Sequence, residues 1–249
     1  MYLAVHRELI MHPCSITRTC KATFLVLALA IAPALAQYGG DSLVGPPVEK
    51  GRNFKNPDLV ELAELDSAIH LDIHYATSNN FMRRPMYSQA RAFLQRPAAL
   101  ALLRVLRTLR SRGFGLVVFD GYRPWSVSKK FWDETPPEKR IYVANPRTGS
   151  IHNRGCAVDL TLYDLKTGDE VDMPSPYDDF TRRASPAYRG GTIQERAHRE
   201  ILRRAMEAEG FNVNKGEWWH FDYRGWRSYG LLNVPFEKLG RGPKRPQGE

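Results

Sequence analysis

The chain has 249 residues, of which 43% are hydrophobic, so it is long enough to bury a substantial core. It carries 36 Lys and Arg against 27 Asp and Glu, a formal net charge of +9. This basic excess suits anionic cell-wall polymers or membrane surfaces. We expect no nucleic-acid partner, because the arginines are scattered and no recognition motif occurs.

The first 36 residues have the pattern of a signal peptide. Arg18 and Lys21 precede an apolar run over 24–35, which ends in Ala34-Leu35-Ala36. This run is shorter than the roughly 20 residues that a membrane-spanning helix needs, and the small-residue ending is typical of signal cleavage. We therefore predict that residues 1–36 are removed and that the protein is exported, periplasmic or extracellular, without a stable membrane anchor.

The remaining chain predicts a single domain. Residues 37–58 are rich in Gly and Pro and indicate an extended lead-in. The domain itself covers 59–239, and a polar basic tail covers 240–249. Cys156 is the only cysteine left after cleavage, so no internal disulfide is expected.

Hydrophobic periodicity predicts alternating strands and helices in the first half of the domain. Residues 69–75 alternate with the period of a strand, and His70 and His74 fall on its polar face. The predicted elements that follow are a helix over 97–112, a buried strand over 114–119, a turn over 120–124 and a short helix through Phe131.

The second half is expected to hold one helix and a final strand pair. Thr192 and Glu195 form a capping-box pattern for a helix that ends at Gly210. A strand pair is predicted around 218–223, and 163–191 lacks any period and reads as a long loop. One α+β domain is the simplest fold class for this order of elements.

The stretch from Ser150 to Leu160 carries the first candidate site residues. After Gly155 the strand alternation is clean, and Asp159 falls on the face opposite Cys156. A histidine just before a strand, here His152, can meet a carboxylate on that strand, and zinc accepts such donors. Gly155 allows the backbone to bend between them. Taken separately, His152 and Asp159 read as a loop histidine and an exposed strand residue.

A second cluster is Glu217-Trp218-Trp219-His220, an acid and a histidine flanked by large rings. In a regular strand Glu217 and His220 would point to opposite faces. Both reach one metal only if the chain turns or bulges near Trp218. The competing interpretation is a core strand with a hydrogen-bonded histidine.

A third element is Arg123 in the turn Gly121-Tyr122-Arg123-Pro124, which follows the buried strand. Alone it is an ordinary loop arginine. Beside a metal, its permanent charge could stabilise the oxyanion of a tetrahedral intermediate.

Together these motifs resemble the zinc D-alanyl-D-alanine dipeptidases, which include the dipeptidase of vancomycin resistance. The resemblance also includes Tyr75-Ala76-Thr77 and Asn80-Phe81, so it covers most of the mature chain in matching order and spacing. It implies a central antiparallel sheet flanked by helices, like that of the zinc D,D-peptidase or hedgehog-type fold.

The resemblance also implies the role of each site residue. His152, Asp159 and His220 would bind one Zn2+ per chain, Glu217 would be the general base, and Arg123 would stabilise the transition state. Ser150, Asp178 and Tyr122 would contact substrate, with Asp179 nearly as good a candidate as Asp178. Cys156 differs from the family pattern, and we expect a buried, inert thiol there.

The implied activity is hydrolysis of the D-alanyl-D-alanine dipeptide to free D-alanine in cell-wall peptide turnover, with peptidoglycan fragments as further partners. Two alternatives stay open. One is a zinc D,D- or L,D-carboxypeptidase that trims peptidoglycan stem peptides, and the other is a non-catalytic wall-binding module. The presence of both Glu217 and Arg123 disfavours the module.

Overall fold

A computed structural model describes residues 43–240. The predicted signal peptide over 1–36 and the tail beyond 240 lie outside the described residues. None of the helices within 43–240 combines the length and the apolar character that a membrane crossing requires.

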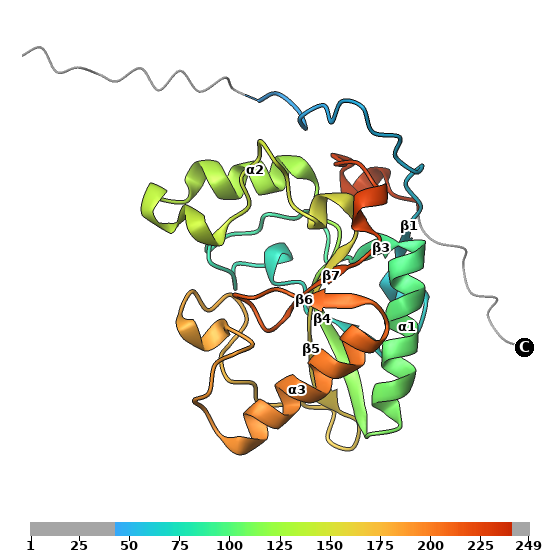
Figure 1. Ribbon diagram of the computed structural model, residues 1–249, viewed down its shortest axis with the longest axis vertical. Helices are drawn as coiled ribbons and strands as arrows, with labels where there is room; N and C mark the ends of the chain where they lie inside the picture. The colour runs from blue at the N-terminus through green and yellow to red at the C-terminus, as the bar shows by residue number, and fades with distance from the viewer. Residues whose placement is uncertain (1–42, 241–249) are drawn as a thin grey trace, which may run out of the picture. The chain divides into compact units, whose positions relative to one another are not determined.

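A five-stranded sheet forms the centre of the fold (Figure 1). Its strand order is β2-β4-β5-β7-β6. Its strands are β2 (Ile69–Leu71), β4 (Phe114–Asp120), β5 (Ala157–Asp164), β6 (Phe211–Val213) and β7 (His220–Tyr223). Three neighbouring pairs are antiparallel, but β2 and β4 are parallel. The α+β class is confirmed, whereas the expectation of a wholly antiparallel sheet is wrong for this pair, because a helical crossover connects its two strands.

Three α-helices accompany the sheet, namely α1 (Arg96–Arg110), α2 (Trp125–Glu134) and α3 (Ile193–Ala208). Each lies within a few residues of its predicted position. At the start of α3, Thr192 Oγ1 accepts from the Glu195 backbone and the Glu195 carboxylate accepts from the Thr192 backbone. The predicted capping box is therefore present and fixes where this helix begins.

The two faces of the sheet have different partners. Leu116, Val118 and Leu160 are fully buried in one hydrophobic cluster with residues of α1 and α3. The alternate positions of the same strands, which include Phe119 and Asp159, point to the opposite face. Asp159 therefore stands on the face that the two long helices leave free.

The first predicted strand is shorter than expected. β2 ends at Leu71, and a 3-10 helix over His74–Ala76 replaces the rest of the predicted 69–75 strand. The Tyr75 carbonyl accepts hydrogen bonds from the backbone of Met86 and Tyr87, which holds the chain away from the sheet. A short-range alternation could not reveal this contact with a later loop.

A separate ladder joins β1 (Leu59–Glu61) to β3 (Phe93–Gln95) in antiparallel register. Residues 43–58 ahead of it contain no helix or strand. They are nevertheless attached to the domain, since Lys55 donates its backbone N–H to the Ser228 carbonyl and Glu49 pairs with Arg154.

Candidate metal centre and active site

His152 lies in a single 3-10 turn, His152–Arg154, immediately before β5. The turn ends at Gly155, whose φ of 66° lies in the left-handed region that favours glycine. A Cβ at this position would also meet the Leu59 side chain at 2.4 Å. Gly155 therefore provides the bend predicted from the sequence, and it directs His152 over the start of β5.

Asp159 and His220 are brought together by strand pairing. They are direct register partners in the antiparallel pair of β5 and β7. The chain between β6 and β7 turns back on itself, with the His220 N–H donating to the Glu217 carbonyl at 3.4 Å. This is the turn near Trp218 that the sequence required for Glu217 and His220 to face one site.

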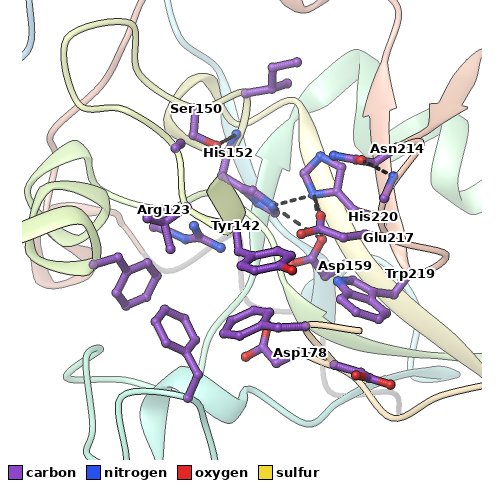
Figure 2. A pocket seen from close by; sticks show the side chains of 18 of the residues that line it. Arg123, Tyr142, Ser150, His152, Asp159, Asp178, Asn214, Glu217, Trp219 and His220 are labelled. Carbon is purple, nitrogen blue, oxygen red and sulfur yellow. Dashed lines mark hydrogen bonds and ion pairs between the residues drawn. The ribbon is translucent and has the colours of Figure 1, made fainter. Parts of the chain in front are cut away.

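The three predicted ligand side chains converge in the structure (Figure 2). His152 Nε2 lies 3.1 Å from His220 Nδ1 and 3.4 Å from Asp159 Oδ1. His220 Nδ1 lies 3.0 Å from Asp159 Oδ1. Donors at about 2 Å from a tetrahedral zinc are about 3.3 Å from one another, so these separations suit that ion.

The outer hydrogen bonds of the two histidines leave their inner nitrogens as acceptors. His152 Nδ1 lies 2.7 Å from the Gly121 carbonyl oxygen, which can only accept. His220 Nε2 lies 2.9 Å from Asp222 Oδ1. In neutral imidazoles the protons thus sit on the outer nitrogens, and two lone pairs face each other across 3.1 Å. A cation bound between the two nitrogens would turn this repulsion between lone pairs into attraction.

Asp159 completes the donor set with one free oxygen. Its Oδ2 accepts from the Tyr177 hydroxyl at 3.0 Å, while its buried Oδ1 has no hydrogen-bond partner in the described part of the chain. Burial would raise the pKa of Asp159, but the protonated forms of His152 and His220 outweigh it and lower this pKa. A cation between the three groups would favour the ionised carboxylate in the same way when both imidazoles are neutral. An ionised oxygen facing two lone pairs is the arrangement of a metal site, so the residues present fit a zinc ion.

Glu217 lies beside these ligands without joining them. Its Oε2 is 3.7 Å from His220 Nδ1, and its side chain is 29% exposed toward the pocket. Burial raises the pKa of Glu217 above its usual value, although the nearby His220 opposes this change. A carboxylate with a raised pKa at this distance is suited to exchanging protons with a water near the metal site.

Arg123 is held rigidly on the other side of the pocket. Its Nη2 and Nε donate to Asp120 Oδ2 at 2.7 and 3.0 Å. The other oxygen of Asp120 accepts from the Tyr87 hydroxyl at 2.8 Å. The guanidinium carbon also lies 4.9 Å from the Phe131 ring centroid. These contacts fix the direction in which Arg123 presents its charge to the pocket.

Two of the three predicted substrate-binding residues line the pocket. Ser150 is partly buried, and its Oγ accepts from the His152 backbone at 3.2 Å. Asp178 accepts from the Tyr75 hydroxyl at 3.1 Å on both oxygens. Its φ of 59° is unusual for a residue other than glycine, a strain that commonly marks functional positions. Burial, followed by the charge of Asp159, raises the pKa of Asp178 to about 8.

Asp179 also lines the pocket, but its Oδ1 accepts locally from the Thr181 backbone at 2.9 Å. The Tyr75 hydroxyl thus orients the Asp178 carboxylate, while the Asp179 carboxylate stabilises a turn. Both belong to the segment predicted as a long loop, whose described course contains one 3-10 turn, Arg182–Ala184.

Tyr122 does not reach the pocket. It is fully buried, and its hydroxyl accepts from the Val234 N–H at 2.8 Å and donates to the carbonyl of the same residue. The structure therefore corrects its assignment as a substrate contact, because the ring points into the core from the turn that holds Arg123. Cys156 is fully buried, and burial raises the pKa of its thiol to about 12.

The pocket has a volume of about 470 Å³ and combines charged and aromatic walls. One wall holds the metal-site residues and Glu217. The other is a chain of aromatic rings in which Phe131, Phe81, Phe180 and Tyr142 succeed one another at centroid distances of 5.0–5.4 Å. Such a pocket can hold a small polar molecule with apolar side chains.

Several supporting residues escaped the sequence analysis. Asp222 follows His220 by two positions in a strand, a spacing that places both on one face and could have revealed it. Asp120 precedes Arg123 by three positions, at the end of β4. Tyr177 comes from a loop and Tyr75 from the 3-10 helix His74–Ala76, and no local pattern in the sequence connects them with Asp159 or Asp178.

Two buried histidines and a carboxylate, with an acid and an arginine beside them, define the class of metal-dependent hydrolases. Within this class, the chain belongs to the D-ala-D-ala dipeptidase family, whose model matches residues 55–229. The D-alanyl-D-alanine dipeptidase of Escherichia coli strain K12 is 32% identical over 72% of this chain and 91% of its own length. That of Enterococcus faecium is 35% identical over 66% of this chain and 90% of its own.

Among solved structures, a vancomycin resistance D,D-dipeptidase, VanXYg, in complex with a D-Ala-D-Ala phosphinate analog, is 21% identical. The match covers 66% of each chain with a TM-score of 0.35, which is a weak likeness.

Proposed function

We propose that this protein is an exported zinc dipeptidase that hydrolyses D-alanyl-D-alanine to two molecules of D-alanine in cell-wall peptide turnover. The observation that carries the proposal is the convergence of two histidine lone pairs and the free oxygen of Asp159 beside Glu217. Family membership supports the choice of dipeptide. The signal-peptide pattern of residues 1–36 supports export.

His152, Asp159 and His220 would hold one zinc per chain. A bound zinc supplies Lewis-acid chemistry, lowering the pKa of water and polarising a carbonyl group. Three protein ligands leave a fourth position for this chemistry. Asp222 and the Gly121 carbonyl keep the two imidazoles in the orientation that the ion needs.

Glu217 acts as the general base and then as the general acid. Its carboxylate takes a proton from the water that attacks the peptide carbonyl and passes a proton to the leaving amine. Water thus contributes its hydroxyl to one D-alanine and a proton to the other. The partly buried position of Glu217 supports this exchange, because it raises the pKa and a raised pKa makes a carboxylate a better base.

Arg123 stabilises the charge that develops on the carbonyl oxygen. Its guanidinium is fixed by Asp120 before substrate arrives, so no reorganisation is needed during the reaction. Asp178 accepts the substrate ammonium, and Ser150 contacts the terminal carboxylate. The Asp178 carboxyl, with its pKa of about 8, becomes fully ionised when an ammonium lies against it.

The assay that tests this function is release of D-alanine by purified residues 37–249, with zinc and after treatment with a chelator. D-alanyl-D-alanine and a stem pentapeptide serve as substrates. We expect zinc-dependent release from the dipeptide alone. Release from the pentapeptide alone would assign a carboxypeptidase instead, and zinc binding without turnover of either peptide would indicate a wall-binding module.

A further inference from the structure

Arg154 is a buried arginine at the end of the turn that carries His152. Its side chain is 5% exposed, and its two terminal nitrogens donate to the two oxygens of Glu49 at 2.7 and 3.0 Å. The guanidinium also donates to the Tyr229 carbonyl and lies 5.3 Å from the Trp226 ring centroid. Glu49 therefore provides the carboxylate that balances this buried charge.

The turn His152–Arg154 is anchored at each of its residues. His152 bonds to the Gly121 carbonyl, and the Asn153 amide donates to the Arg123 carbonyl at 2.8 Å. The Arg154 carbonyl accepts from the buried Gln95 side chain at 3.0 Å. The Arg154 side chain is thus the anchor that bonds directly to a side chain of the segment ahead of the domain.

Glu49 lies in that segment, over 43–58, and outside the residues that the family model matches. The segment is held in place by Lys55, whose N–H donates to the Ser228 carbonyl, and by Asp58, whose N–H donates to Gln95 Oε1. Gln95 in turn contacts the metal-ligand turn through Arg154. The segment and the turn are therefore connected twice.

We propose that Glu49 is a positioning residue for the metal centre, acting through Arg154 to hold His152 in its ligating orientation. A buried arginine that loses its carboxylate seeks solvent or a new partner. Because Arg154 is the last residue of the turn that His152 begins, we expect its rearrangement to shift this turn. The consequence is weaker metal binding, beyond any general loss of stability. This inference rests on the metal site of the proposed function.

The chain offers a matched control for Glu49→Gln. Glu61 makes the same two-bond pair with Arg91, at 2.8 and 2.6 Å, and both side chains are largely buried. This pair lies at the ladder of β1 and β3, and neither residue lines the pocket. Glu61→Gln therefore removes an equivalent ion pair without touching the metal-ligand turn.

The test compares zinc affinity, measured by competition with a chelating dye, and thermal unfolding of the zinc-free proteins. We expect Glu49→Gln to weaken zinc binding about tenfold, at the lower end of the effect of outer contacts on metal ligands. Glu61→Gln should lower the melting temperature comparably and leave zinc affinity within about twofold of wild type, since its pair is remote. Glu49→Asp, which keeps the charge, should restore part of the affinity.

Equal zinc affinities in wild type, Glu49→Gln and Glu49→Asp would overturn the inference, as would equal losses in Glu49→Gln and Glu61→Gln. If Glu49→Gln does not fold, the zinc affinity of Glu49→Asp is compared with those of wild type and Glu61→Gln. A Glu49→Asp affinity no weaker than that of Glu61→Gln would then overturn the inference. Failure of wild type to bind zinc would instead contradict the proposed function, so the two failures are distinguishable.

Discussion

Glu217→Gln is expected to abolish most of the dipeptidase activity while the protein still binds zinc. Glutamine has nearly the same shape but cannot accept the proton of the attacking water. Loss of a positioned general base costs roughly 100- to 10,000-fold in rate, and the effect should appear in kcat rather than in KM. Glu217 is not among the three converging ligands, so zinc stoichiometry should stay at the wild-type value.

The measurement is kcat for D-alanyl-D-alanine alongside zinc content after dialysis. Glu138→Gln is a suitable control, because it removes one carboxylate from an exposed position outside the pocket. Its kcat should equal that of wild type. A Glu217→Gln protein with wild-type kcat would exclude Glu217 as the base, and loss of zinc in this variant would make it a ligand instead.

Asp159→Asn is expected to lose zinc and activity together. The change removes the negative charge between two imidazoles and presents an amide that binds zinc poorly. Asp222→Asn is the graded comparison, since Asp222 touches the same His220 from the outer side. Loss of such an outer partner typically weakens metal binding about 10- to 100-fold, and loss of Asp159 should exceed this.

Isothermal titration of the zinc-free proteins with zinc ranks the two variants against wild type. The expected order of affinity is wild type, then Asp222→Asn, then Asp159→Asn. Zinc binding in Asp159→Asn that is as tight as in Asp222→Asn would contradict the assignment of Asp159 as a direct ligand.

The sequence predicted those parts of the fold that depend on local periodicity and caps. The buried strand over 114–119, which β4 extends by one residue, the helix that Thr192 and Glu195 begin, and the bend at Gly155 all follow from short-range rules. The parallel pairing of β2 and β4 did not follow from them, because strand direction within a sheet depends on how distant segments cross over.

The residues of the candidate site likewise fall into those that a sequence motif predicts and those that depend on tertiary packing. His152, Asp159, Glu217 and His220 are each carried by a recognisable motif, and the structure brings them together. Tyr122 belongs to the same motif as Arg123, yet its ring packs in the core, since adjacent residues of a turn point in different directions. The partners that orient the site come from distant segments, and their selection depends on tertiary packing.

The pairing of Glu49 with Arg154 could not be predicted from any sequence motif. The segment that holds Glu49, with its Gly and Pro content, predicts an extended lead-in, and its backbone contains no regular element. Only the buried position of Arg154 gives the Glu49 carboxylate a structural role. Charge balance in the core thus connects Glu49, which lies outside the family match, to a residue of the metal-ligand turn.

The most direct test of the zinc assignment is anomalous diffraction at the zinc absorption edge from crystals of the zinc-loaded protein. We predict one strong peak per chain, about 2 Å from each of His152 Nε2, Asp159 Oδ1 and His220 Nδ1. A zinc-loaded crystal with no peak between these three atoms, or with its zinc bound elsewhere, would contradict the metal centre on which the proposed activity depends.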